Sequence, residues 1–173
     1  MSDSDEFSLI VPYRMSTGAP LIPNEGAGRL MANWRLYDCP TQAEDRANEP
    51  EMPLIKLHQP AGRYRCLLSR LDPDDVHAAY GLADCGAGFP EIGYIRLDEI
   101  MSWRDAAGYT LERDEHFRPG ASLFRYWEIW RDEALQFDAG GQLIIPGADS
   151  ERAVKTMSPY SKRPDIYTAA VRS

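Results

Sequence analysis

The stretch YGLADCGAGFPEIGYIRLDEI, residues 80–100, decides the fold expected for this chain of 173 residues. It contains a short apolar run, a glycine-rich bend with one proline, a second run with strand character and the beginning of a helix. The glycines permit the positive φ angles that a tight turn needs. The order predicts a strand near 77–83, another strand over 91–97 and a helix over about 97–107, which Gly108 would end.

The residues before this stretch predict two more strands of a β-meander. An apolar strand over 54–58 leads through the turn QPAG into a strand over 63–71, and DPDD at 72–75 is a further turn. Side chains alternate along 63–71, which predicts one buried and one solvated face. The buried face would carry Tyr64, Cys66 and Leu68, and the solvated face would carry Arg63, Arg65 and Ser69.

Helices at both ends of the meander complete the expected fold. Apolar residues have helical spacing near 25–37, and Ser122 is placed to cap a helix that runs to about 136. We therefore predict a single α+β domain, in which two to three helices pack on one face of an antiparallel sheet of about four strands. This domain spans 21–136. It lies between a flexible arm at 1–20 and a C-terminal extension at 137–173, which holds an edge strand in GGQLIIPG and a basic tail at 151–173.

The composition is that of a chain that can bury a core. Hydrophobic residues make up 43% and aromatic residues 10%, which is too many for a disordered chain. No apolar run approaches the roughly 20 residues that cross a bilayer, and the N-terminus MSDSDEF carries acids where a secretory signal carries basic residues. We therefore expect a cytoplasmic protein without a membrane partner, whose Cys39, Cys66 and Cys85 are reduced thiols.

The formal net charge of −8 bears on the kind of partner. An acidic body repels phosphates, so nucleic-acid binding is expected only through the tail at 151–173, which has five bases and two acids. The charge favours a basic protein partner, although it is also an ordinary charge for solubility. The acids expected to bind such a partner are Asp72, Asp74, Asp75, Glu112, Asp114 and Glu115.

An alternative hypothesis is a small metal-dependent hydrolase. Carboxylate oxygens and an imidazole suit a divalent ion, and the candidate ligands are Asp84, Glu91, Asp114 and His116. Their spacing fits no established metal motif, and the run Glu112-Arg113-Asp114 is more simply interpreted as local ion pairs. Enzymatic activity is therefore the less favoured hypothesis, and no cofactor is expected.

Two further motifs in the opening stretch carry little chemistry. The glycines at 86–93 lack the spacing of a nucleotide-binding loop, and a strand follows them where that loop requires a helix N-terminus. Cys85 lies among small residues and is interpreted as a packed, inert thiol.

The chain resembles a bacterial family known as domain of unknown function 2958. The resemblance runs from LIPN at 21 through LIKLHQPAG, LLSRLDPDD and the opening stretch to LERDEHFRP and about residue 135. The combined order of GFPEIGY and LERDEHF is its specific part. The resemblance implies a small cytoplasmic protein encoded on plasmids or integrative elements, often near antirestriction genes, with no established catalytic activity or ligand.

The chain departs from this family at three positions. Relatives have cysteine where this chain has Ala83, an apolar residue where it has Cys85 and serine where it has Arg96. A thiol that changes position argues against a catalytic thiol, and the missing serine makes Asp98 the expected cap of the helix near 97–107. We therefore expect a non-enzymatic interaction protein of a mobile element, which antagonises a host defence complex or another nucleic-acid-binding complex by presenting acids to a basic groove.

Overall fold

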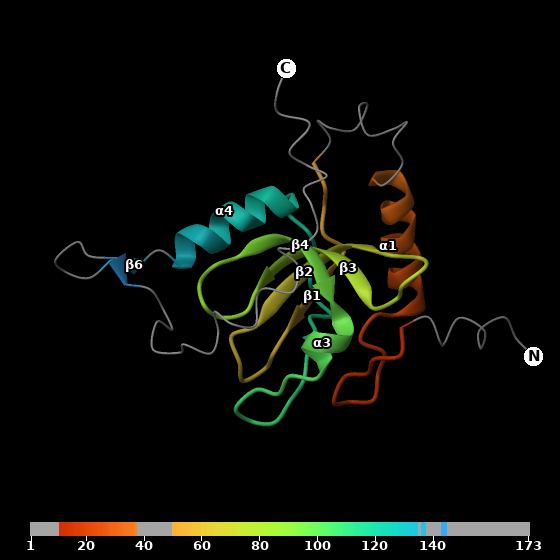
Figure 1. Cartoon of the computed structure of the whole chain (residues 1–173), viewed down its shortest axis with the longest axis horizontal. Helices are drawn as coiled ribbons and strands as arrows, with labels where there is room; N and C mark the ends of the chain where they lie inside the picture. Colours follow the sequence, from red (N-terminus) through yellow and green to blue (C-terminus); the bar gives the residue numbers. More distant parts are fainter. Residues whose placement is uncertain (1–10, 38–49, 135, 138–142, 145–173) are drawn as a thin grey trace, which may run out of the picture.

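The computed structural model describes residues 11–37, 50–134, 136–137 and 143–144. A five-stranded antiparallel sheet forms its centre, so the predicted α+β fold is confirmed (Figure 1). The strands are β1 (Ile55–His58), β2 (Arg65–Leu71), β3 (Ala78–Asp84), β4 (Glu91–Arg96) and β5 (Glu112–Arg113). Their order across the sheet is β4-β3-β2-β1-β5. The first four strands are the predicted meander, and β5 adds a short strand at the β1 edge.

Three helices accompany the sheet: α1 (Asn24–Tyr37), α3 (Leu97–Met101) and α4 (Leu123–Ala134). The first confirms the helix expected near 25–37. Ser122 caps α4 as predicted, because its Oγ accepts a hydrogen bond of 3.2 Å from the backbone amide of Arg125. Ahead of α4, the backbone amide of Leu123 donates to the carbonyl of Glu51, which fastens the start of the helix to the chain before β1.

The helix predicted over 97–107 is much shorter than expected, because α3 ends at Met101. Ser102 closes it, since both its amide and its hydroxyl donate to the carbonyl of Glu99. The predicted cap Asp98 is also wrong: Arg96 occupies the N-cap position without a side-chain cap bond, and Asp98 lies inside the helix, paired with Arg96. Gly108 has a φ of +85° but belongs to a separate turn, in which its amide donates to the carbonyl of Asp105.

Both faces of β2 are buried, which corrects the prediction of one solvated face. Cys66 and Leu68 join the larger core with α1, whereas Leu67 points the other way and joins a second cluster with α4. Helices therefore cover both faces of the sheet, and not one face as expected; Figure 1 shows α1 and α4 on different sides. Ser69, expected on the wet face, is fully buried and donates to Glu51. A period-two pattern cannot reveal this, because the covering helix begins more than 50 residues later in the chain.

The ends of the described chain also differ from the expected arm and extension. Val11 and Met15 are buried in the larger core, so the packed body includes residues 11–20 of the expected arm. The strands β6 (Gln136–Phe137) and β7 (Leu143–Ile144) pair with each other and form a separate two-stranded sheet, so the edge strand expected in GGQLIIPG does not join the main sheet. The basic tail at 151–173, the first ten residues and Cys39 lie outside the described residues. No helix in the described ranges is long and apolar enough to cross a membrane.

The glycine-rich bend joins β3 to β4, as predicted. Gly86 and Gly88 have φ angles of +88° and +81°, which side chains rarely permit. The carboxylate of Asp84 accepts a hydrogen bond of 2.9 Å from the amide of Gly86 and fixes the first turn of the bend. The bend lies against the β1–β2 hairpin, because a β-carbon at position 86 would come within 2.5 Å of the β-carbon of Arg63.

Candidate functional site

A pocket of about 550 Å³ lies on the α4 side of the sheet. α4 packs mainly over β3 and β4 and reaches β2 through Trp130, which contacts Leu67 and Arg65, so the β1 side of this face is the least covered by the helix. The segment 114–118 after β5 forms a further wall. The pocket is therefore bounded by residues that are close in space but spread over more than 70 positions of sequence. Its lining consists of Lys56, His58, Gln59, Gly62, Arg63, Tyr64, Arg65, Leu67, Asp114, Phe117, Arg118, Tyr126 and Trp130.

Strand register brings the floor of the pocket together. Lys56 pairs with Leu67, and His58 pairs with Arg65, across the antiparallel β1–β2 ladder. Directly opposed residues point to the same face of a sheet, and residues two apart on one strand do so too. The four side chains therefore share the face that the pocket opens on.

Two of the four cations in the lining are neutralised within the pocket walls. Lys56 Nζ lies 3.0 Å from the Asp114 carboxylate, and the hydrogen bond that it donates holds the pKa of that carboxyl below its usual value. Arg65 lies 3.0 Å from Glu133 and 3.6 Å from the buried Asp84. Its guanidinium also stacks over the Trp130 ring at 4.1 Å. Because carboxylates neutralise them, these two cations contribute to the shape of the pocket and add little net positive charge to it.

The other two cations are available to a ligand. Arg63 and Arg118 are exposed side chains that line the pocket. Arg118 donates only to backbone carbonyls, and no carboxylate in the described part of the chain pairs with either arginine. A planar guanidinium presents two parallel N–H donors that match a phosphate or a carboxylate.

His58 lines the same pocket, and one nitrogen of its ring is unsatisfied. Its Nδ1 is buried and has no hydrogen-bond partner among the described residues. Buried polar atoms are nearly always paired, and an exception calls for a ligand, a water or an ion. An imidazole beside two unpaired guanidinium groups is suited to binding an oxyanion.

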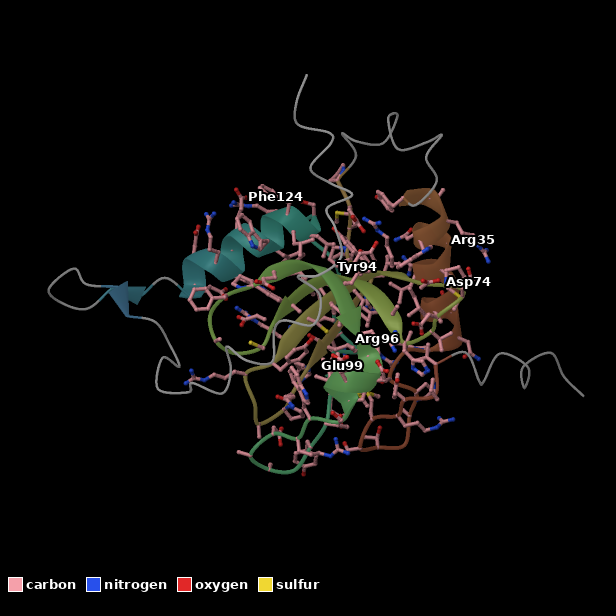
Figure 2. The ribbon with its side chains drawn as sticks, in the orientation of Figure 1. Arg35, Asp74, Tyr94, Arg96, Glu99 and Phe124 are labelled. Atoms are coloured by element: carbon pink, nitrogen blue, oxygen red, sulfur yellow. The ribbon has the colours of Figure 1, made fainter. Side chains whose placement is uncertain are left out.

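The six acids predicted to bind a partner do not form one surface. Asp72, Asp74 and Asp75 lie in the β2–β3 turn, whereas the others lie on or just after β5, at the opposite end and edge of the sheet. Figure 2 shows Asp74 on the side of α1, away from α4. The three acids on or just after β5 are Glu112, Asp114 and Glu115.

Five of these six acids also have partners within the chain. Asp72 accepts from the Asp74 amide, and Asp75 pairs with Arg96. Near β5, Glu112 accepts a hydrogen bond from the Ser16 amide. Asp114 forms an ion pair with Lys56, and Glu115 forms one with Arg113. The hydrogen bond from the His77 amide, with the Arg96 pair, lowers the pKa of the Asp75 carboxyl. These acids therefore hold turns and segments in place.

The four alternative metal ligands are not brought together. Asp84 ends β3 and Glu91 begins β4, but Asp114 and His116 follow β5 at the far edge of the sheet. Three strand spacings of about 4.8 Å separate β3 from β5, or roughly 14 Å. In the described ranges no three acidic, histidine or cysteine side chains are grouped as a metal site would require. Cys85 is half-buried, and this burial raises the pKa of its thiol.

Of the residues predicted from the sequence as binding residues or metal ligands, Asp114 lines the pocket, and the other lining residues were not among them. One signal for them is present in the sequence. The run KLHQPAGRYR, residues 56–65, contains two arginines, a lysine and a histidine without any acid, in a chain of net charge −8. The segment 114–118 and α4 could not be assigned to the same site, because only the folded sheet brings them beside this hairpin.

The fold and site define a small α+β protein that is built on a five-stranded sheet and has a ligand-sized pocket beside the helix α4. The chain belongs to the family described as protein of unknown function DUF2958, whose model matches residues 21–135. The predicted family is thereby confirmed. No curated protein matches the chain, and no solved structure does either.

Proposed function

We propose that this protein is a non-enzymatic binding protein that holds a small phosphorylated or similarly anionic ligand in the pocket under α4. One observation supports this most: Arg63 and Arg118, neither of which pairs with a carboxylate of the described residues, are exposed and line one cavity together with Lys56 and His58. The volume of about 550 Å³ lies in the range of small-molecule sites. Since the whole chain carries −8, the local gathering of cations is a specific arrangement and not a general basic surface.

The expected mechanism of charge mimicry receives less support. Its acids lie at opposite ends of the sheet, and five of them are occupied by partners inside the chain. The mobile-element origin, the link to antirestriction and the cytoplasmic setting remain parts of the proposal that rest on the family resemblance.

Calorimetric titration of the full chain with inorganic pyrophosphate tests the proposal. We expect the wild-type chain to bind, and the double variant Arg63→Gln/Arg118→Gln to bind at least tenfold more weakly. Each lost charge-assisted contact costs about 1.5–3 kcal/mol. The double variant Arg29→Gln/Arg35→Gln is the matched control, because it also removes two positive charges, both from exposed residues of α1. Figure 2 shows Arg35 on the side away from α4.

Two results would overturn the proposal. One is the absence of heat with the wild-type chain at millimolar pyrophosphate and low salt. The other is equal affinity in the wild type and the double variant, which would place the anion elsewhere. Circular dichroism of all variants shows whether the fold is retained.

A further inference from the structure

The pocket has an aromatic side as well as a cationic side. Phe117 and Tyr126 lie next to each other, with ring centroids 6.2 Å apart and ring planes at 51°. Both are partly buried and line the pocket. Trp130, one helical turn beyond Tyr126, is buried and completes this wall. A small anion without an apolar group would gain little from contact with these rings.

The aromatic side chains are held in place from behind. The Tyr126 hydroxyl accepts a hydrogen bond of 3.1 Å from the Gly120 amide. The Trp130 ring is covered on one side by the guanidinium of Arg65 at 4.1 Å. Phe117 follows a tight turn in which its amide donates to the carbonyl of Asp114. The rings therefore form a pre-set apolar surface beside the free guanidinium groups, which is how a flat ligand is bound at low entropic cost.

We infer that the ligand is a nucleoside 5′-phosphate, whose planar base packs against Phe117 and Tyr126 while its phosphate is bound by Arg63 and Arg118. This inference rests on the proposed function, since it names the ligand class of the same pocket. A heterocyclic base provides the flat, polarisable ring that stacks on aromatic side chains. Gln59 and His58 line the same cavity, and their polar side chains are suited to hydrogen bonds with the sugar or the base edge.

A free nucleotide fits the electrostatics better than a nucleic-acid strand. A strand would lay a row of phosphates along a surface, and a chain of −8 repels such a row. A single nucleotide needs only the local cations of the pocket. The glycine bend is not the phosphate loop; its place is behind Arg63, which it supports.

The test compares four probes on the full chain by calorimetry. Adenosine 5′-monophosphate and uridine 5′-monophosphate carry a base and a phosphate, and ribose 5-phosphate carries the phosphate without a base. A 5′-phosphorylated hexanucleotide carries bases and phosphates within a strand. We expect at least one mononucleotide to bind about tenfold or more tightly than ribose 5-phosphate, because stacking on aromatic rings contributes at that level. We expect the hexanucleotide to bind no tighter than the mononucleotide.

The variant Phe117→Leu separates the aromatic wall from the cations. It should abolish most of the preference for the mononucleotide over ribose 5-phosphate. Phe124→Leu is the control, because Phe124 is 59% exposed on the outer side of α4, stacked on Trp127 and absent from the pocket lining (Figure 2).

The outcomes distinguish this inference from the proposed function. Equal affinities for mononucleotide and ribose 5-phosphate would overturn the nucleotide inference and leave anion binding intact. A preference that survives in Phe117→Leu would overturn the assigned position of the base, and tighter binding of the hexanucleotide would overturn the small-molecule assignment. If neither pyrophosphate nor any phosphate probe binds, the proposed function fails as well. The comparison of probes uses the wild-type chain, so it stays decisive if a variant does not fold.

Discussion

Gly86 in the β3–β4 bend lies directly behind Arg63 in the β1–β2 hairpin. A β-carbon at position 86 would come within 2.5 Å of the β-carbon of Arg63, and Gly86 has a φ of +88°. The bend that dominates the sequence and the arginine at the mouth of the pocket are therefore in contact. The absence of a side chain at Gly86 sets the position of a guanidinium that we assign to phosphate binding.

The substitution Gly86→Ala is expected to lower both the free energy of unfolding and the affinity for pyrophosphate. The left-handed backbone alone costs about 1–2 kcal/mol for alanine, and the collision with Arg63 adds to this cost and displaces the hairpin. Gly18→Ala is the matched control: Gly18 has a φ of +83°, but an added β-carbon would meet nothing within 4 Å. Urea denaturation and pyrophosphate titration check both effects. Equal losses of stability in the two variants, with unchanged affinity, would show that the contact at Gly86 does not matter.

The substitution Asp114→Asn is expected to strengthen anion binding. Asp114 is the only carboxylate among the described lining residues, and it neutralises Lys56 at 3.0 Å. Asparagine keeps the acceptor for the His116 amide but removes the negative charge. We expect the affinity for pyrophosphate to rise by about fivefold at low salt, with the gain falling as salt screens the charges. The partly exposed ion pair contributes little to stability, so unfolding should change by less than about 1 kcal/mol. A weaker affinity in this variant would mean that Asp114 binds the ligand itself.

The substitution Glu51→Gln is expected to destabilise the fold far more than the loss of an exposed acid. Glu51 holds the buried Arg70 through two hydrogen bonds of 2.6 and 2.7 Å, and it also accepts from Ser69. The substitution removes the carboxylate charge from a buried pair and weakens two charge-assisted hydrogen bonds, so we expect a loss of about 2–4 kcal/mol in the free energy of unfolding. Glu128→Gln breaks the exposed pair with Arg125 on α4 and should cost at most about 0.5 kcal/mol. Chemical denaturation of the two variants measures both free energies of unfolding, and equal losses would contradict the prediction.

Stability is expected to fall in alkali because of two buried groups. Burial raises the pKa of the Cys66 thiol to about 12 and raises the pKa of the Tyr64 hydroxyl well above its usual value. Both groups stay neutral in the folded chain but ionise in the unfolded chain, where a thiol has a pKa of about 9. Their contribution to stability is complete below about pH 9 and is lost as the pH rises toward 12. For Cys66 this is about 2 kcal/mol between pH 8 and 10.5. Urea denaturation at these two pH values measures how far the free energy of unfolding falls between them. This fall should be smaller in Cys66→Ala than in the wild type. Identical decreases would exclude Cys66 as a cause.

Local patterns in the sequence were sufficient for most of the sheet. The turn chemistry of DPDD and the glycine bend mark the ends of β2, β3 and β4, so three strands and their antiparallel order could be predicted. The helix after β4 was predicted too long, because the apolar residues of 97–107 continue the pattern while Ser102 closes the backbone. A hydroxyl that bonds to the last turn of a helix has no signature that distinguishes it from a surface serine.

The pocket could not be predicted, because it depends on pairings between distant segments. Alternation along 63–71 correctly separates Arg65 from Cys66, but it cannot show that α4 will cover the face on which Arg65 lies. An arginine in a strand looks solvated in sequence. In the structure Arg65 stacks on Trp130 and bonds to Glu133, and neither residue is near it in the chain. For the acids, the sequence shows the nearby partner Arg113 of Glu115 but not the distant partners Ser16, Lys56 and Arg96, which only the fold brings to Glu112, Asp114 and Asp75.

The position of α4 in the chain sets the order in which the pocket is built during synthesis. The floor, from Lys56 to Leu67, leaves the ribosome about 60 residues before Trp130, which closes the wall. Until α4 is complete, the side of the sheet that carries Leu67 and Leu82 lacks Leu123 and Trp130, the two buried residues that α4 contributes to this cluster. A ligand of this pocket would therefore recognise the domain only after α4 has docked. By binding to the docked helix it would slow the opening of α4 and so protect the domain from proteases.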